Sequence, residues 1–218
     1  MKRISILLAI LLVANIPFCS AAKPSAFFDI RGHWAEEIIM KYYSEGTISG
    51  YPDGAFRPDD PVKRGELAKI ITNAFDLKEE IPFDYPDIDG TEWFYDYLKY
   101  SANYIPSYQY LEYSFFGNNN AHRIDVAETL IEIRMQNEDL TIEMPSPDNI
   151  VAEVLSIFED IDYSAGKIEY PNVQRLFKYT WLSNEMNIIE GYPDGNFHPY
   201  WGITRAELLT VIDRIKNY

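Results

Sequence analysis

Three arginines stand at matching places in the sequence, and each could bind an anion. Arg64, Arg123 and Arg205 are each followed two residues later by an acid and then by an aliphatic residue. Thr204-Arg-Ala-Glu207 has the pattern of a helix capping box, which places Arg205 in the first turn of a helix. A cation at that place is mildly unfavourable, by roughly 0.3–1 kcal/mol. The guanidinium and the free first-turn N–H groups would together suit a carboxylate or phosphate of a ligand.

The same arginines have a second interpretation, which is an internal salt bridge. Asp29, Asp87 and Asp160 each precede an isoleucine near the start of a repeated segment. Such a carboxylate could accept the arginine and fix a loop to a helix. Spacing alone favours the anion site and the salt bridge equally, and both hold if the aspartate orients the arginine for a ligand.

Trp34 and Trp93 follow two of these aspartates and also allow two interpretations. An indole can stack on the C–H face of a sugar, but the same ring is equally a normal core anchor. For isolated tryptophans the core is favoured. The 17 tyrosines of the chain could line saccharide grooves or the wet edges of helical cores, and they discriminate little.

An internal repeat carries these residues. The loop Gly50-Tyr-Pro-Asp-Gly-Ala-Phe-Arg-Pro58 returns as Gly191-Tyr-Pro-Asp-Gly-Asn-Phe-His-Pro199, and seven of the nine positions are identical. Each copy begins 14 residues before its arginine. A third, eroded copy around Arg123 has lost this loop. All three copies keep an aromatic residue eight positions before the arginine, at Phe56, Phe115 and Phe197.

Each repeat is predicted to form a helix, a loop and a second helix. The segments after the arginines place apolar residues at helical spacing: Leu67, Ile70, Ile71 and Ala74; Val126, Leu130 and Ile133; Leu208, Val211, Ile212 and Ile215. The first helices are expected to carry Trp34, Ile38 and Tyr42, and then Trp93, Tyr97 and Tyr104, on one face. A unit of about 50 residues buries too little surface to stand alone. The sequence therefore predicts a mainly α fold in which three units pack as a pseudo-threefold bundle.

The units are unequally spaced, because 59 residues separate Arg64 from Arg123 and 82 separate Arg123 from Arg205. Pro145-Ser-Pro147 breaks the chain, and Asp148 is the expected N-cap of a short extra helix. That helix would carry Ile150, Val151, Val154 and Leu155. The expected division of the chain is a signal peptide at 1–22, units at 27–76, 85–137 and 158–218, and a linker at 138–157.

The first 22 residues have a basic start, an apolar stretch and a small-residue exit, which are typical of a secretory signal peptide. The apolar run Ile4–Val13 is too short to span a bilayer, and no later segment reaches the roughly 20 apolar residues needed. Phe18 before Cys19 is too bulky for a lipoprotein signal, so cleavage is expected near Ala21 or Ala22. The mature chain would then be extracellular and free of cysteine and disulfides.

Charge and motifs exclude several classes of function. The net charge is −15, and loss of Lys2 and Arg3 with the signal makes it −17, so nucleic acid is not an expected partner. His33, His122 and His198 lack metal-ligand spacing, and the acids after Asp87 and Asp160 do not complete a calcium loop. No serine elbow, phosphate loop or zinc-protease motif is present. We expect no metal, no cofactor and no catalytic residue.

Phe28-Asp-Ile-Arg-Gly-His-Trp-Ala-Glu36, the repeated glycine loop and Ile203-Thr-Arg-Ala-Glu207 together resemble the S-layer homology family. The resemblance covers 27–75, 85–136 and 158–218. It implies three units with pseudo-threefold symmetry that bind secondary cell-wall polysaccharide, often with pyruvylated sugars, in grooves between the units. The residues that match the family's groove positions are Asp29, Trp34, Arg64, Asp87, Trp93, Arg123, Asp160 and Arg205.

The chain departs from the family's pattern at three places. The second unit lacks the glycine loop, Tyr170 stands near the expected tryptophan of the third unit, and Lys63 replaces the capping threonine. One or two working grooves and salt-sensitive binding are therefore expected. The resemblance implies a non-enzymatic anchor at the cell wall. One alternative is a module with degenerate grooves that binds other surface-layer proteins, and a small secreted hydrolase is a more distant one.

Overall fold

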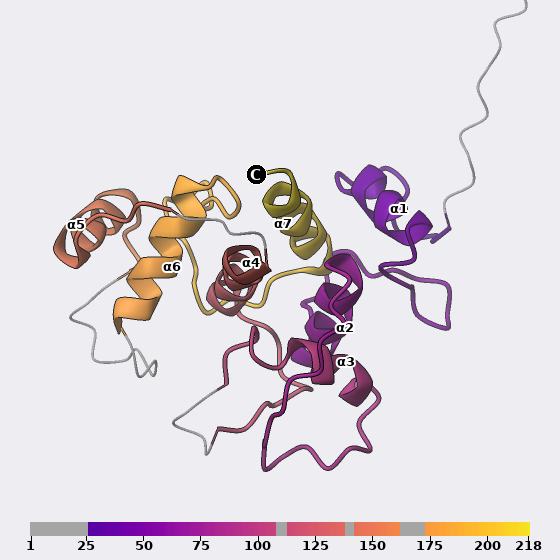
Figure 1. The fold of residues 1–218 in the computed structure, drawn as a ribbon. Helices are drawn as coiled ribbons and strands as arrows, with labels where there is room; N and C mark the ends of the chain where they lie inside the picture. Colours follow the sequence, from indigo (N-terminus) through magenta and orange to yellow (C-terminus); the bar gives the residue numbers. More distant parts are fainter. Residues whose placement is uncertain (1–25, 108–112, 138–141, 162–172) are drawn as a thin grey trace, which may run out of the picture.

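The fold is helical, as the repeat pattern predicts. The computed structural model describes residues 26–107, 113–137, 142–161 and 173–218. In these ranges the regular structure is helical, and β structure is limited to isolated bridges. The expected signal peptide and Tyr170 lie outside the described residues. None of the described helices has the length and apolar character that a membrane crossing requires. The helices, drawn in Figure 1, are α1 (Glu36–Ser44), α2 (Arg64–Ala74), α3 (Tyr95–Ser101), α4 (Arg123–Asn137), α5 (Pro147–Ile157), α6 (Val173–Glu185) and α7 (Arg205–Asn217).

The second helices of the units, α2, α4 and α7, form the centre of the core. Every apolar residue that the spacing places on their inner faces is buried, from Leu67 and Leu130 at 0% exposure to Ala74 at 7%. The Thr204 hydroxyl accepts from the Glu207 N–H, and the Glu207 carboxylate accepts from the Thr204 N–H, so the predicted capping box is confirmed. The local sequence pattern is therefore enough to predict these helices and their buried faces.

The first helices begin later than expected. Trp34 and Trp93 lie in turns before α1 and α3, and their side chains are 65% and 55% exposed. The prediction that they are core anchors is therefore wrong. Ile39 and Tyr42 supply the buried face of α1 instead, and Leu98 supplies that of α3.

Helix α5 lies where the short extra helix is predicted, but it begins at a different residue. Ser146 is the N-cap and accepts from the Asn149 N–H, while Pro147 occupies the first helical position. Proline suits that position because its φ is preset and the N–H that it lacks would have no helical partner, so Asp148 lies in the first turn rather than at the cap. Ile150 and Val154 are buried, and α5 packs against α6. Leu155 is 47% exposed.

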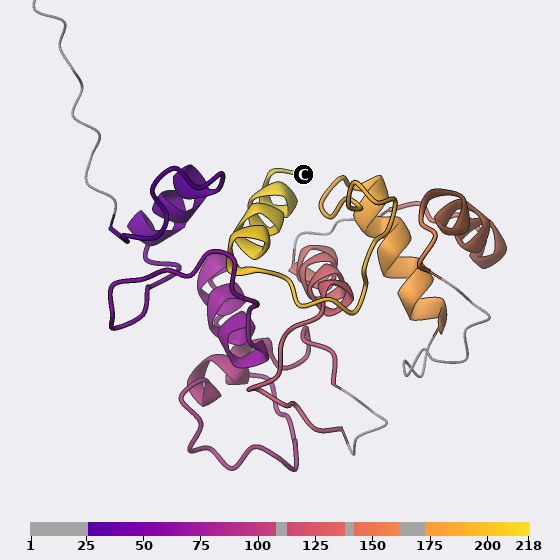
Figure 2. The same ribbon diagram turned by 180° about the vertical axis from the view of Figure 1, so that it is seen from behind.

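Equivalent contacts join the units in cyclic order. The second helix of each unit packs against the first helix of the next, as α2 on α3, α4 on α6 and α7 on α1. Helix α7 lies between α1 and α4 in both views (Figures 1 and 2). Residues two positions before the arginines form a ring of backbone hydrogen bonds: Val62 donates to Ile203 (2.9 Å), Ile203 to Ala121 (3.1 Å) and Ala121 to Val62 (2.8 Å).

Two glycines allow close approach between the first and second units. The Gly65 N–H donates to the Gly117 carbonyl at 2.8 Å. A Cβ on Gly65 would lie 2.4 Å from the Phe94 ring, and a Cβ on Gly117 would lie 2.1 Å from it. Phe94 is buried, so its ring has little room to move away. The contact between α2 and α3 thus depends on the absence of side chains at these positions.

Gly65→Ala should therefore lower the free energy of unfolding by about 1–3 kcal/mol, the usual effect of overpacking. Helix propensity alone would make this substitution stabilising, because alanine favours a helix over glycine by about 1 kcal/mol. A loss of stability would therefore indicate the steric conflict. Urea denaturation followed by circular dichroism measures it. In a Phe94→Leu background the effect should shrink, and a stabilising Gly65→Ala would contradict the contact.

Candidate functional site

The three repeated arginines are buried at the boundaries between units. Arg64 is 0% exposed, Arg123 4% and Arg205 5%. Each Nε donates to the backbone carbonyl of the repeated loop phenylalanine in the next unit of the cycle. These bonds run from Arg64 to Phe115 (2.6 Å), from Arg123 to Phe197 (3.0 Å) and from Arg205 to Phe56 (2.8 Å).

The other guanidinium nitrogens also have partners in that neighbouring unit. One Nη of each arginine donates to a second backbone carbonyl, at Pro106, Glu190 and Ser49 respectively. The other faces the acid that stands two residues after the neighbour's own arginine. These pairs are Arg64 with Asp125 (3.4 Å), Arg123 with Glu207 (3.9 Å) and Arg205 with Glu66 (3.2 Å). In the Arg-x-acid pattern, the arginine of each unit thus pairs with the acid of the next unit in the cycle.

The first-turn amides, expected to be free for an anion, are occupied as well. Backbone N–H groups of the three arginines donate to carbonyls of Asn119, Trp201 and Asp60 at 2.9–3.0 Å. The next amide in each helix also donates to a neighbouring loop. Loop carbonyls of the adjacent unit thus occupy the amides that an anionic ligand would need.

The opening aspartates hold the loops. Each carboxylate accepts from two successive backbone amides, that of the loop phenylalanine and the one after it. The second amide belongs to Arg57, Phe116 or His198, residues whose positive φ of 52–60° turns both N–H groups toward the acid. The acids that pair with the arginines are therefore Glu66, Asp125 and Glu207. The salt bridge between aspartate and arginine that the spacing allowed is not formed, because the aspartates bind loop amides and the arginines pair with these other acids. Asp29, Asp87 and Asp160 are the three loop-holding residues.

A cleft of about 200 Å³ opens beside Arg205 at the meeting of the three units. The third unit supplies Arg205, the second supplies Trp93, and the first supplies the remaining lining residues. Those used below are Ser49, Tyr51, Glu66 and Lys69. The exposed indole of Trp93 thus lies on the wall of this cleft instead of in the core.

Polar side chains in this cleft form hydrogen bonds with one another. The Tyr51 hydroxyl donates to Glu66 at 2.6 Å, and burial together with this bond raises the pKa of Tyr51 to about 12. Tyr51 is therefore a neutral hydroxyl near pH 7. Lys69 Nζ lies 3.3 Å from the Ser49 hydroxyl. Because Arg205 and Glu66 neutralise each other, Lys69 gives the cleft its net positive charge.

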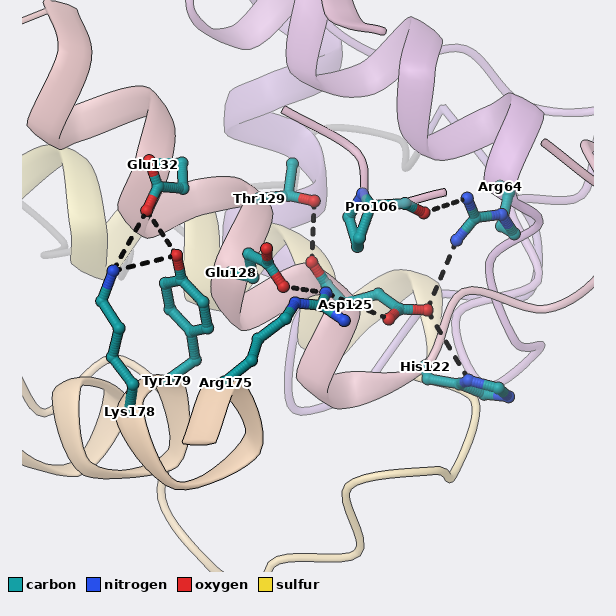
Figure 3. Close-up of polar contacts among 10 residues, drawn as sticks. All are labelled: Arg64, Pro106, His122, Asp125, Glu128, Thr129, Glu132, Arg175, Lys178 and Tyr179. Atoms are coloured by element: carbon teal, nitrogen blue, oxygen red, sulfur yellow. Dashed lines mark hydrogen bonds and ion pairs between the residues drawn. The ribbon is translucent and has the colours of Figure 1, made fainter. Parts of the chain in front are cut away.

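The corresponding boundary around Arg64 is filled by internal ion pairs. Asp125 is 0% exposed and lies among Arg64, His122 (3.6 Å) and Arg175 (3.8 Å), as Figure 3 shows. Arg175, from α6, also pairs with Glu128. Burial lowers the pKa of His122, although Asp125 opposes this effect. Side chains of the second and third units therefore occupy the space where a ligand's acid would meet this arginine.

At the third boundary Tyr192 covers Arg123. The guanidinium carbon lies 4.4 Å from the ring centre, and the Tyr192 hydroxyl donates to Glu207 at 2.8 Å. Nearby, Trp201 is 56% exposed and stacks on His198 at 3.6 Å. Trp201 and Lys69 could not be singled out from the sequence, because single surface residues of these types carry no spacing signal.

Residues 26–68 and 183–209 match the family described as the S-layer homology domain. These two segments carry the sequence features of the S-layer homology domain. Cell surface glycoprotein 1 of Acetivibrio thermocellus is 42% identical to it over 69 residues, which are 31% of this chain and 3% of that protein. The surface-layer 125 kDa protein of Lysinibacillus sphaericus is 34% identical over 88 residues, 40% of this chain and 7% of that protein.

A third relative, the cellulosome-anchoring protein of Acetivibrio thermocellus, is 42% identical over 48 residues, 22% of this chain and 11% of that protein. The chain thus spans only a small part of each of these relatives. All three are named as proteins of the cell surface or as anchors. The matched residues include the first opening motif and both glycine loops. The first loop accepts a hydrogen bond from Arg205, and the second accepts one from Arg123.

Proposed function

We propose that this chain is a non-catalytic module that attaches to a secondary cell-wall polysaccharide through the cleft beside Arg205. The observation that carries the proposal is the convergence of all three units on one cleft that has charged and hydroxyl groups and an exposed indole on its wall. The family match and the names of the relatives support a place at the cell surface.

The chemistry of the cleft suits a sugar. The Trp93 ring offers an apolar face for a sugar's C–H face, and Tyr51 and Ser49 offer hydroxyl groups to its polar edge. Lys69 adds a cation, which suits an acidic substituent such as the pyruvyl group that the family resemblance implies. Binding that depends on such a contact should weaken as salt increases.

The eight residues matched to the family divide into two roles in this proposal. Trp34 and Trp93, both exposed, are the candidate sugar contacts. The three arginines and three aspartates hold the loops and unit boundaries that shape the grooves. We further propose that the boundary around Arg64 binds no sugar, because Arg175 occupies it from within.

Trp93→Ala should weaken binding to purified cell-wall sacculi by at least about tenfold, the scale of an interface hot spot. The parent chain should sediment with sacculi and lose this binding when the polysaccharide is stripped from them. The melting temperature should change little because the indole is largely exposed. Tyr218→Ala, an exposed aromatic at the C-terminus, is the matched control and should bind like the parent.

Other results separate the alternatives. Sedimentation that survives stripping would favour a protein partner on the wall, and release of reducing ends from wall material would favour a hydrolase. If Trp93→Ala sediments as well as the parent, the cleft beside Arg205 is not the binding site.

A further inference from the structure

We infer that Lys69, rather than Arg205, is the cation that meets the acidic group of the wall polysaccharide, and that the residue at this position makes the three grooves unequal. The inference rests on the proposed function and assigns the charge-recognising residue within it. Three features carry it: the engagement of Arg205, the position of Lys69, and the residues that stand at the equivalent places in the other units.

Arg205 is poorly placed to bind an incoming acid. Each of its three guanidinium nitrogens already donates, to Phe56, Glu66 and Ser49. Its side chain is 6% exposed, and Glu66 cancels its charge at 3.2 Å. A ligand carboxylate would have to compete with these internal acceptors inside a boundary that the arginine itself holds together.

Lys69 has the opposite character. It lies on α2, lines the cleft, and is in contact with a neutral hydroxyl, that of Ser49 at 3.3 Å. Its ammonium group also lies 5.7 Å from the centre of the Tyr97 ring. Within the described residues Lys69 forms no ion pair with a carboxylate. Its charge is thus available to a ligand in the cleft.

The equivalent positions in the other units have different charges. Lys69 stands five residues after Arg64, Glu128 five after Arg123, and Thr210 five after Arg205. Glu128 is negative and is paired with Arg175. The Thr210 hydroxyl donates to the backbone carbonyl of Ala206 at 3.1 Å. One helix position therefore supplies a cation, an acid and a neutral group to the three boundaries.

This single position has a large effect because the rest of the chain repels anions. The net charge is −15, but salt screens charges beyond about 8–10 Å, so local groups determine the contact. A charge-assisted hydrogen bond is roughly twice as strong as a neutral one. The groove with Lys69 should accordingly prefer acidic sugars, and the other two should not.

The test uses the full chain and wall polysaccharide released from sacculi, in its native form and with its carboxyl groups chemically reduced. Lys69→Thr copies Thr210, Lys69→Glu copies Glu128, and Lys69→Arg keeps the charge. Lys78→Thr is the matched control, since that lysine is exposed, makes the same charge change and does not line this cleft. Isothermal titration calorimetry measures the dissociation constants.

We expect Lys69→Thr to weaken native polysaccharide binding roughly tenfold, and Lys69→Glu to weaken it more. Lys69→Arg and Lys78→Thr should stay within about threefold of the parent, and the reduced polysaccharide should bind the parent and Lys69→Thr alike. Unchanged affinity of Lys69→Thr with loss in Trp93→Ala would overturn the role of Lys69 and leave the anchoring proposal standing. An equal loss in Lys78→Thr would attribute the effect to overall charge and also overturn it. A parent chain that binds neither polysaccharide would instead refute the anchoring proposal itself.

Discussion

Arg205→Ala should lower the free energy of unfolding by about 3–5 kcal/mol, the usual result of removing one partner from a buried ion pair. The substitution leaves Glu66 without its cation and removes the donors that face the carbonyls of Phe56 and Ser49. It also removes the packing of the guanidinium on the Phe56 ring, 4.5 Å away. Urea denaturation of the full chain measures the change.

Two variants test whether burial of the ion pair causes this loss of stability. Arg57→Ala removes an exposed pair with Asp53, and its effect should stay below about 1 kcal/mol. Arg205→Met with Glu66→Leu removes both charges together and should recover part of the stability lost in Arg205→Ala. A chain with Arg205→Ala that unfolds at the parent's urea concentration but loses polysaccharide would show that the arginine is a ligand contact after all.

Asp125→Ala should have an effect of similar size, about 3–5 kcal/mol, at the boundary around Arg64. Asp125 and Arg64 are both 0% exposed, so loss of the carboxylate leaves a buried guanidinium with one fewer partner. Arg175 also loses an acid, although Glu128 remains beside it. Thermal unfolding followed by circular dichroism provides the measurement.

Asp96→Ala is the matched control for this prediction. Asp96 also lies in the first turn of a helix, so loss of its charge includes the same helix-dipole effect. Its partner is Lys99, and its own side chain is 84% exposed, which limits the expected change to about 1 kcal/mol. Equal losses in the two variants would contradict the description of the Arg64 boundary as filled by essential ion pairs.

Features determined by local sequence were predictable. Apolar spacing located α2, α4 and α7 with their buried faces, and the Thr204–Glu207 capping box fixed the start of α7. The repeated loop identified the units before any contact between them was known. In each case neighbouring residues in the sequence are also neighbours in space, so the pattern and the physical cause coincide.

Contacts between units could not be predicted in the same way. Spacing placed an aspartate near each arginine within one unit, but the actual acid comes from the next unit around the cycle. Trp93 allows both a core and a groove interpretation from sequence alone, because the residue type does not indicate which side the indole presents. Lys69 resembles any solvated helix lysine until the cleft is seen. The proposed binding site thus depends on boundaries that no single repeat encodes.

The ring of amide bonds through Val62, Ala121 and Ile203 affects how the chain can be made. Val62 needs the carbonyl of a residue near the far end of the chain, and α1 needs α7 as its packing partner. Contacts between such distant parts of a sequence form slowly, and the early segments stay exposed meanwhile. During synthesis α2 can therefore meet α3 early, whereas α1 stays without its packing partner until α7 has emerged.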